Sequence, residues 1–162
     1  MIGIAGGADK CAWLTRELGF DAAIDYKAGP VFKALKDAAP KGIDVYFDNV
    51  GGDIFEACLF QMNPYGRVAC CGAVSQYDGA PSPHGPRGVP GLIVVKRLSL
   101  QGFNRDRFRQ RAGAGPGGPA VLGRCRQAQV QEDILDGLER TPEALIGLLA
   151  GDNRGKRMVK VA

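Results

Sequence analysis

Strands and helices alternate along this 162-residue sequence, and the alternation predicts an α/β fold with a Rossmann-like, doubly wound parallel sheet. Two strand ends support this class most directly, because the apolar runs leading to Asp48 and to Cys71 are each followed by glycine. Strands that are apolar on both faces are typical of buried parallel sheets. Ligands bind in such folds beyond the carboxyl ends of the strands, so we expect a nucleotide crevice beside these two ends.

The expected elements follow from apolar spacing and from residues that start or stop helices. Helices are predicted after the N-cap candidates Asp9 and Asp53, and at Pro30 and Thr141, because proline suits the first helical turn. Residues 92–95 form a further apolar run. Strands are predicted over residues 2–5, 22–26, 43–47, 68–73, 98–103 and 158–161.

Composition limits the function classes. A 45% hydrophobic content fits one globular domain with a real core, and no apolar run is long enough to cross a bilayer, so we expect a cytoplasmic protein. The five cysteines form no C-x-x-C pair, and two of them are adjacent on a predicted buried strand, which indicates reduced core thiols. The single histidine, His84, stands in a Pro/Gly-rich stretch, so we expect no metal site and reject catalytic zinc.

The N-terminal part of the predicted fold lacks the glycine-rich turn of dinucleotide-binding domains. Dinucleotide-binding domains open with a strand and a G-x-G-x-x-G turn, and this sequence has no such turn, so residues 2–5 are assigned as the second strand of the fold. An NAD-preferring site places an acidic residue at the tip of that strand. Here the tip is Ala5-Gly6-Gly7, with Lys10 just beyond, which favours a 2′-phosphate and therefore NADP.

Several separate motifs together resemble the cofactor-binding half of the zinc-free medium-chain dehydrogenase/reductases. Within that family the sequence is most similar to the group of prostaglandin reductases and bacterial curcumin or 2-alkenal reductases. The resemblance covers residues 1–103 and 130–162, and implies a C-terminal cofactor-domain part of a longer enzyme whose first strand and glycine-rich turn are missing here. The motifs are GIAGGADKCAWLTRELGFDAAIDYK, VYFDNVGGDIF, QMNPYGRVACCGAVSQY, LSLQGF and LIGLLAGDNRGKRMVKV.

The resemblance implies a set of cofactor-binding residues. Lys10 and Tyr26 match residues that contact the 2′-phosphate, Asn49 matches one that lies on the cofactor, and Asn153 matches one that contacts the dinucleotide as the chain returns. The nicotinamide side is matched by the stretch 71–77, and Phe103 ends a further matching motif. The members of that stretch are Cys71, Gly72, Ala73, Val74, Ser75, Gln76 and Tyr77.

The implied reaction is the reduction of the C=C bond of a small α,β-unsaturated carbonyl compound by hydride from NADPH, followed by protonation of the enolate. Tyr77 could donate its hydroxyl to the enolate, and a surface tyrosine is the alternative reading. The family's habit makes a homodimer plausible. We expect no membrane and no nucleic-acid partner.

Residues 104–129 differ in composition from the rest of the chain. They hold six arginines and one acid, are rich in Gly, Ala and Pro, and replace what the family shows as a loop and an amphipathic helix. Two compensating frameshifts in a GC-rich gene would give this result. We therefore expect a partial NADP-binding domain over residues 1–129, with 104–129 atypical, and a return segment of the substrate domain over 130–162.

Three functions remain open from the sequence. The first is an NADP-dependent enone reductase, here as its cofactor domain. The second is a non-catalytic remnant with weak or no nucleotide binding, and it ranks first for the activity of these 162 residues alone, because in the family the other domain forms the opposite wall of the substrate pocket. The third is an Arg-rich nucleic-acid-binding protein, whose affinity would depend on salt.

Overall fold

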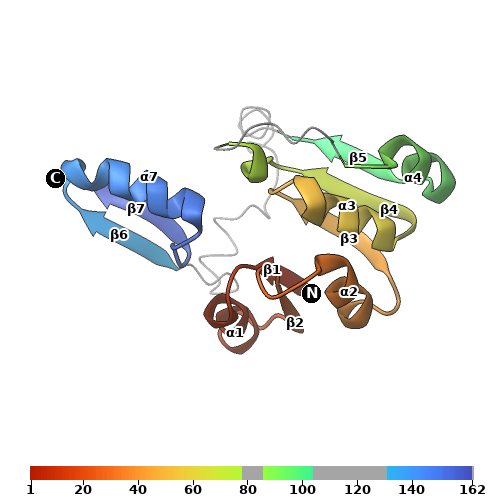
Figure 1. Ribbon diagram of the computed structural model, residues 1–162, viewed down its shortest axis with the longest axis horizontal. Coiled ribbons are helices and arrows are strands. Elements are labelled where there is room, and N and C mark those ends of the chain that lie inside the picture. Colours follow the sequence, from red (N-terminus) through yellow and green to blue (C-terminus); the bar gives the residue numbers. More distant parts are fainter. Residues whose placement is uncertain (78–85, 104–130, 162) are drawn as a thin grey trace, which may run out of the picture. The chain divides into compact units, whose positions relative to one another are not determined.

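The computed structural model describes residues 1–77, 86–103 and 131–161 (Figure 1). The chain divides into two units, Met1–Arg107 and Phe108–Ala162, which are described separately. The predicted domain boundary at 129/130 and the frameshift hypothesis for 104–129 lie outside the described residues. No helix among the described residues is long and apolar enough to cross a membrane.

In the first unit, strands and helices alternate as the sequence predicts (Figure 1). The strand Ile2–Ala5 forms over the expected residues, and the other predicted strands of this unit form with shifted ends. The apolar run 92–95, which was assigned to no element from the sequence, lies in a helix. The elements in chain order are β1 (Ile2–Ala5), α1 (Ala8–Arg16), β2 (Ala22–Asp25), α2 (Val31–Ala38), β3 (Ile43–Asp48), α3 (Gly52–Gln61), β4 (Met62–Cys70), the 3-10 turn η1 (Val74–Gln76), α4 (Val89–Lys96) and β5 (Ser99–Gly102).

The predicted N-caps Asp9 and Asp53 are wrong. Both residues lie inside the first helical turn, and the N-cap positions are held by Gly7, with φ 96°, and Gly51, with φ 72°. The physical reason is the tight reversal that follows each strand, which needs a positive φ that glycine adopts without strain.

The parallel strands of this unit form two separate sheets. Among the described residues, β1 pairs only with β2, in the register Ile2↔Ala22 to Ala5↔Asp25. The other sheet has the order β3-β4-β5, with Asp48 opposite Cys70 and Cys70 opposite Gly102. The carboxyl ends of β3, β4 and β5 therefore lie side by side at one edge.

Helices cover opposite faces of the strands. On β1, a Cβ added to Gly3 would meet Leu14 of α1, whereas Ile2 and Ile4 pack on the other face against the cluster of Ile24, Leu35, Ala57 and Cys58, which includes residues of α2 and α3. Because alternate residues of a strand point to opposite faces, α1 lies on one face and α2 and α3 lie on the other.

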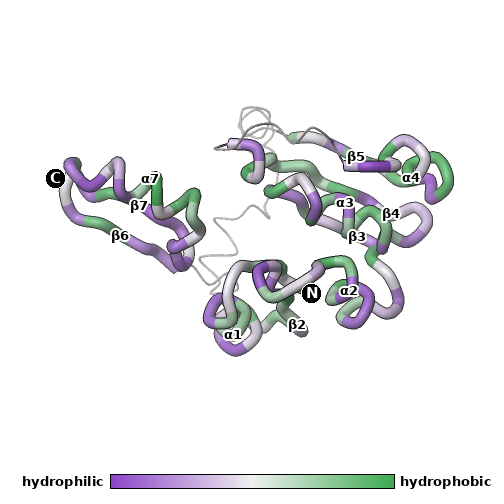
Figure 2. The backbone as a smooth tube through the Cα atoms, in the orientation of Figure 1, coloured by the Kyte–Doolittle hydropathy of each residue, from purple (hydrophilic) through white to green (hydrophobic). Residues whose placement is uncertain are grey.

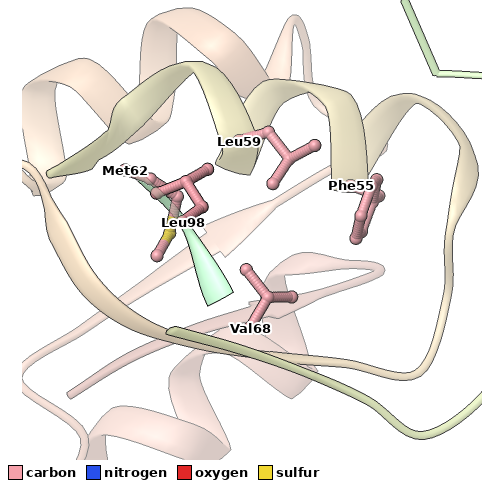
Figure 3. Packing of buried hydrophobic residues seen from close by; sticks show 5 residues of the cluster. All are labelled: Phe55, Leu59, Met62, Val68 and Leu98. Atoms are coloured by element: carbon pink, nitrogen blue, oxygen red, sulfur yellow. The ribbon is translucent and has the colours of Figure 1, made fainter. Parts of the chain in front are cut away.

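A second buried cluster holds α3 and α4 against the three-stranded sheet (Figure 3). Leu59 is fully buried in it, and Lys96 of α4 donates hydrogen bonds to the carbonyls of Phe60 (2.7 Å) and Met62 (2.8 Å) just beyond it. Figure 2 shows hydrophobic residues along β4 and α4. The members of the cluster are Phe55, Leu59, Met62, Val68 and Leu98.

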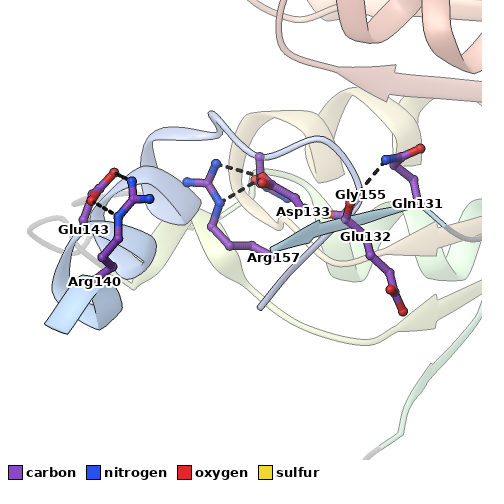
Figure 4. A network of polar contacts seen from close by, with 8 residues as sticks. Gln131, Glu132, Asp133, Arg140, Glu143, Gly155 and Arg157 are labelled. Atoms are coloured by element: carbon purple, nitrogen blue, oxygen red, sulfur yellow. Dashed lines mark hydrogen bonds and ion pairs between the residues drawn. The ribbon is translucent and has the colours of Figure 1, made fainter. Parts of the chain in front are cut away.

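The second unit contains β6 (Glu132–Asp136), the 3-10 turn η2 (Leu138–Arg140), α7 (Thr141–Ala150) and β7 (Lys156–Lys160). β6 and β7 are parallel neighbours. Arg157 of β7 donates from Nε (3.0 Å) and Nη2 (2.8 Å) to Asp133 of β6, and Arg140 pairs with Glu143 (Figure 4). The sequence did not predict β6, because its short run begins and ends on charged residues.

We expect Leu59→Ala to lower the free energy of unfolding by about 2–5 kcal/mol, because it opens a cavity in a site with no exposed side-chain surface. Urea unfolding followed by circular dichroism measures the loss. The matched control is Val94→Ala in α4, whose side chain is 75% exposed and whose truncation should change little. Equal losses in the two variants would show that this cluster is not the core.

Candidate functional site

The turn after β3 is built around one buried carboxylate. Asp48 is only 3% exposed, and its Oδ1 accepts hydrogen bonds from the hydroxyl of Tyr46 (2.7 Å) and from the backbone N–H groups of Gly51 (3.1 Å) and Val50 (3.3 Å). A carboxylate that accepts from the two following amides fixes the turn from inside. The sequence Asp-Asn-Val-Gly-Gly is thereby held in one conformation at the carboxyl end of β3.

The segment after β4 is hydrogen-bonded to this turn. Backbone N–H groups of Cys71, Val74 and Ser75 donate to the carbonyls of Asp48 (2.7 Å), Asn49 (3.1 Å) and Val50 (3.1 Å), in that order. The hydroxyl of Ser75 also donates to Val50 O at 2.6 Å. The turn 48–52 and the segment 71–77 thus form one structure, here called the strand-end ledge.

Gly72 lies at the middle of the strand-end ledge. A Cβ added there would lie 2.7 Å from Oδ1 of Asn49 and 3.4 Å from the hydroxyl oxygen of Tyr77. The structure therefore gathers three of the predicted site residues, and both Asn49 and Tyr77 are exposed to solvent. The Asn49 amide and the Tyr77 phenol lie beside Gly72, which has no side chain. A flat ring can therefore approach the backbone closely at this position.

Phe103 joins the strand-end ledge from β5. Its N–H donates to Cys70 O at 3.2 Å, and its ring lies 6.0 Å from that of Phe47. Ala73, Val74 and Gln76 continue the segment through η1. The expectation that Cys71 is a core thiol is wrong, because Cys71 lies beyond the end of β4 and is exposed.

A second candidate site lies at the carboxyl ends of β1 and β2. Gly7 donates its N–H to Oδ1 of Asp25 at 2.8 Å, and the ring of Tyr26 lies against Gly6, 3.0 Å from an added Cβ. Lys10 stands in the first turn of α1, whose N-terminus has no side-chain cap. A cation beside the amides of a helix N-terminus is a favourable place for an anion such as a phosphate.

The remaining predicted residue, Asn153, belongs to the second unit. Its amide donates to Gly155 O at 2.7 Å and closes the loop between α7 and β7. The structure does not place it relative to the strand-end ledge, so its contact with a dinucleotide stays a prediction.

Three groups that are buried or partly buried, Tyr46, Cys58 and Cys70, stay protonated at neutral pH. Burial raises the pKa of the Tyr46 phenol, and burial raises the pKa of the Cys58 thiol to about 12. Burial also raises the pKa of Cys70. These groups therefore act as hydrogen-bonding and packing groups, not as bases. Within residues 1–77, 86–103 and 131–161, no cluster of three or more His, Cys, Asp or Glu side chains could hold a metal ion.

The two candidate sites lie at the carboxyl ends of parallel strands. This arrangement is typical of an α/β domain of the dinucleotide-binding class. The chain belongs to the zinc-binding dehydrogenase family, whose model matches residues 1–113. This confirms the resemblance found in the sequence.

Two reductases and one solved structure are similar to this chain over nearly its whole length. The chain is 38% identical over 173 residues to the NADPH-dependent curcumin reductase of Escherichia coli (strain K12), covering 100% of this chain and 48% of that protein. It is 42% identical over 167 residues to prostaglandin reductase 1 of Bos taurus, covering 99% of this chain and 49% of that protein. Among solved structures, CurA from Vibrio vulnificus in complex with NADPH is similar at 37% identity with a TM-score of 0.90, covering 99% of this chain and 49% of that one. The chain spans about half the length of these relatives.

Sequence reasoning missed the roles of Asp25, Asp48 and Ser75. For Asp48 a signal was available, because an aspartate three residues before a glycine pair is a turn-forming pattern. For Asp25 no local sequence signal was available, because its hydrogen-bond partner Gly7 lies 18 residues away.

We expect Asp48→Ala to destabilise the first unit by about 1–3 kcal/mol, because it leaves the Tyr46 hydroxyl and two turn amides without their acceptor. Urea unfolding measures this loss. Asp48→Asn keeps one acceptor oxygen and should lose less, and Tyr46→Phe removes only one of the donors. An alanine variant as stable as the wild type would show that the carboxylate does not hold the turn.

Asp25 gives a pH dependence. Hydrogen bonds from the amides of Gly7 and Lys27 hold the pKa of Asp25 below its ordinary value of 3.8. A lowered folded-state pKa contributes stability that is present above the unfolded-state pKa and is lost as the pH falls through the folded-state value. We therefore expect the unfolding free energies of wild type and Asp25→Asn to differ at pH 6 and the difference to shrink as the pH falls below 3.8. A constant difference over that range would contradict the assignment.

Proposed function

We propose that this chain provides the cofactor-binding part of an NADPH-dependent reductase that acts on the C=C bond of α,β-unsaturated carbonyl compounds. The observation that carries the proposal is the strand-end ledge, in which Asn49, Gly72 and Tyr77 come together at the carboxyl ends of β3 and β4. The support from known proteins is the similarity to the curcumin and prostaglandin reductases.

The residues present fit NADPH at two places. Lys10 in the first turn of α1 and Tyr26 beside Gly6 fit the 2′-phosphate end. The tip of β1 is Ala5-Gly6-Gly7 and offers no carboxylate to the ribose hydroxyls. The nearby carboxylate, Asp25, is directed at the amides of Gly7 and Lys27. The phosphate of NADP is therefore favoured over the free ribose of NAD.

The strand-end ledge fits the nicotinamide end. The bound cofactor supplies hydride chemistry. Asn49 and the segment 71–77 would hold the nicotinamide ring beside Gly72, and the exposed hydroxyl of Tyr77 would donate to an enolate oxygen of the substrate. The ring of Phe103, 6.0 Å from that of Phe47, lies beside the strand-end ledge on the side of β5.

The proposed reaction needs a further protein surface that covers the substrate side of the strand-end ledge. Hydride transfer requires the enone to be held against the nicotinamide with water excluded. Tyr77 is 64% exposed, so residues 71–77 leave the substrate side of the strand-end ledge open to solvent. We therefore expect nucleotide binding, and not turnover, to be the property that these 162 residues carry.

Titration of the purified chain with NADPH and NADH, followed by nicotinamide fluorescence, tests the proposal. We expect NADPH to bind more tightly, and Lys10→Ala to weaken NADPH binding about tenfold, roughly 1.4 kcal/mol, while leaving NADH binding unchanged. The matched control is Lys33→Ala, which removes the same charge from an exposed position in α2. Binding of neither nucleotide, or equal effects of the two variants, would contradict the proposal.

A further inference from the structure

A second lysine, Lys27, lies at the carboxyl ends of β1 and β2. A Cβ added to Gly6 would be 2.9 Å from Cε of Lys27 and 3.0 Å from the ring of Tyr26. The stem of Lys27 therefore folds back across the tip of β1, although the residue itself follows β2 in the chain. Lys10, in the first turn of α1, follows the same tip directly. Two elements thus bring a lysine to one strand end.

Backbone hydrogen bonds hold the start of the Lys27 side chain beside this tip. The N–H of Tyr26 donates to Ala5 O at 3.1 Å, which continues the contact between the two strands beyond their last paired residues. The N–H of Lys27 donates at 2.9 Å to Oδ1 of Asp25, the same oxygen that accepts from Gly7. The backbone of residues 25–27 is therefore tied to the segment that it faces.

The charges around the tip show what Lys27 adds. The charged residues of segments 5–10 and 25–27 are Asp9, Lys10, Asp25 and Lys27. Hydrogen bonds from two backbone amides hold the pKa of Asp25 below its ordinary value, so this carboxylate is ionised at neutral pH. With Lys10 as their sole cation these segments would carry one excess negative charge, which repels a phosphate monoester of nearly two negative charges. Lys27 cancels that excess.

We propose that Lys27 is a second cationic ligand of the 2′-phosphate of NADP, and that it contributes to the preference for NADP over NAD. This inference rests on the proposed binding of NADPH. Gly6 has no side chain, so the phosphate can lie against the backbone between Lys27 and the Tyr26 ring. The ammonium group of Lys27 acts on the phosphate as a point charge. NAD has no phosphate at this position and gains nothing from the lysine.

Titration of the 162-residue protein with NADPH and NADH, followed by nicotinamide fluorescence, tests the role of Lys27. We expect Lys27→Gln to weaken NADPH binding about fivefold, the size expected for one exposed ion pair, and to leave NADH binding unchanged. Lys27→Arg keeps the charge and should keep most of the NADPH affinity. The matched control is Lys36→Gln, which removes the same charge from an exposed position in α2 and should change neither affinity.

A double variant separates contact with the phosphate from an indirect effect through Asp25, whose pKa the nearby charge of Lys27 also lowers. If Lys27 binds the phosphate, Lys27→Gln weakens NADPH binding in the Asp25→Asn background as it does in the wild type. If Lys27 only offsets the charge of Asp25, Lys27→Gln has no effect in that background, and this result would overturn the proposal. NADH affinity, measured for every variant, shows that the nucleotide site is still folded.

The outcomes distinguish this inference from the proposed function. A wild-type protein that binds neither nucleotide would contradict both. A wild-type protein that prefers NADPH, together with an unchanged NADPH affinity of Lys27→Gln, would overturn the role of Lys27 and leave the proposed function standing. An equal loss of NADPH affinity in Lys27→Gln and Lys36→Gln would also overturn that role, because it would show an effect of total charge and not of position.

Discussion

The candidate site depends on the burial of one carboxylate at the end of a strand. Asp48 accepts hydrogen bonds from a phenol of its own strand and from two amides of the turn that follows, and these bonds stabilise the turn. The carbonyls of that turn in turn receive the amides of residues 71–75. The strand-end ledge, with Asn49, Gly72 and Tyr77, is therefore a consequence of the Asp48 contacts.

A strand-end aspartate also accepts a hydrogen bond from an N-cap glycine at β2, but there the two residues are 18 positions apart in the sequence. Asp25 also ends a strand and also accepts from the glycine at the N-cap of a helix, but that helix is α1, which precedes the strand. Asp48 stabilises a local turn, and Asp25 ties two chain segments together. In both cases the N-cap glycine gives the positive φ, and a strand-end aspartate supplies the acceptor that a glycine cap lacks.

The sequence predicted most of the fold because its signals are local. Apolar runs, prolines and glycine pairs mark β1 to β5 and α1 to α3, and the strand ends at Asp48 and Cys70 were expected beside a ligand. The caps were missed because Asp9 and Asp53 look like caps in isolation, whereas the backbone φ of Gly7 and Gly51 is set by the reversal from the strand. β6 was missed because its strand character comes from pairing with β7, which no local pattern shows.

The two halves of the proposed cofactor site belong to two different sheets. Lys10 and Tyr26 belong to the β1–β2 sheet, and the strand-end ledge belongs to the β3–β4–β5 sheet. Each half is held by its own strand-end aspartate. Helices α2 and α3 pack on both sheets and so link the two halves. A dinucleotide bound to both halves would add a second link, so its binding and the packing of these helices would stabilise the same arrangement.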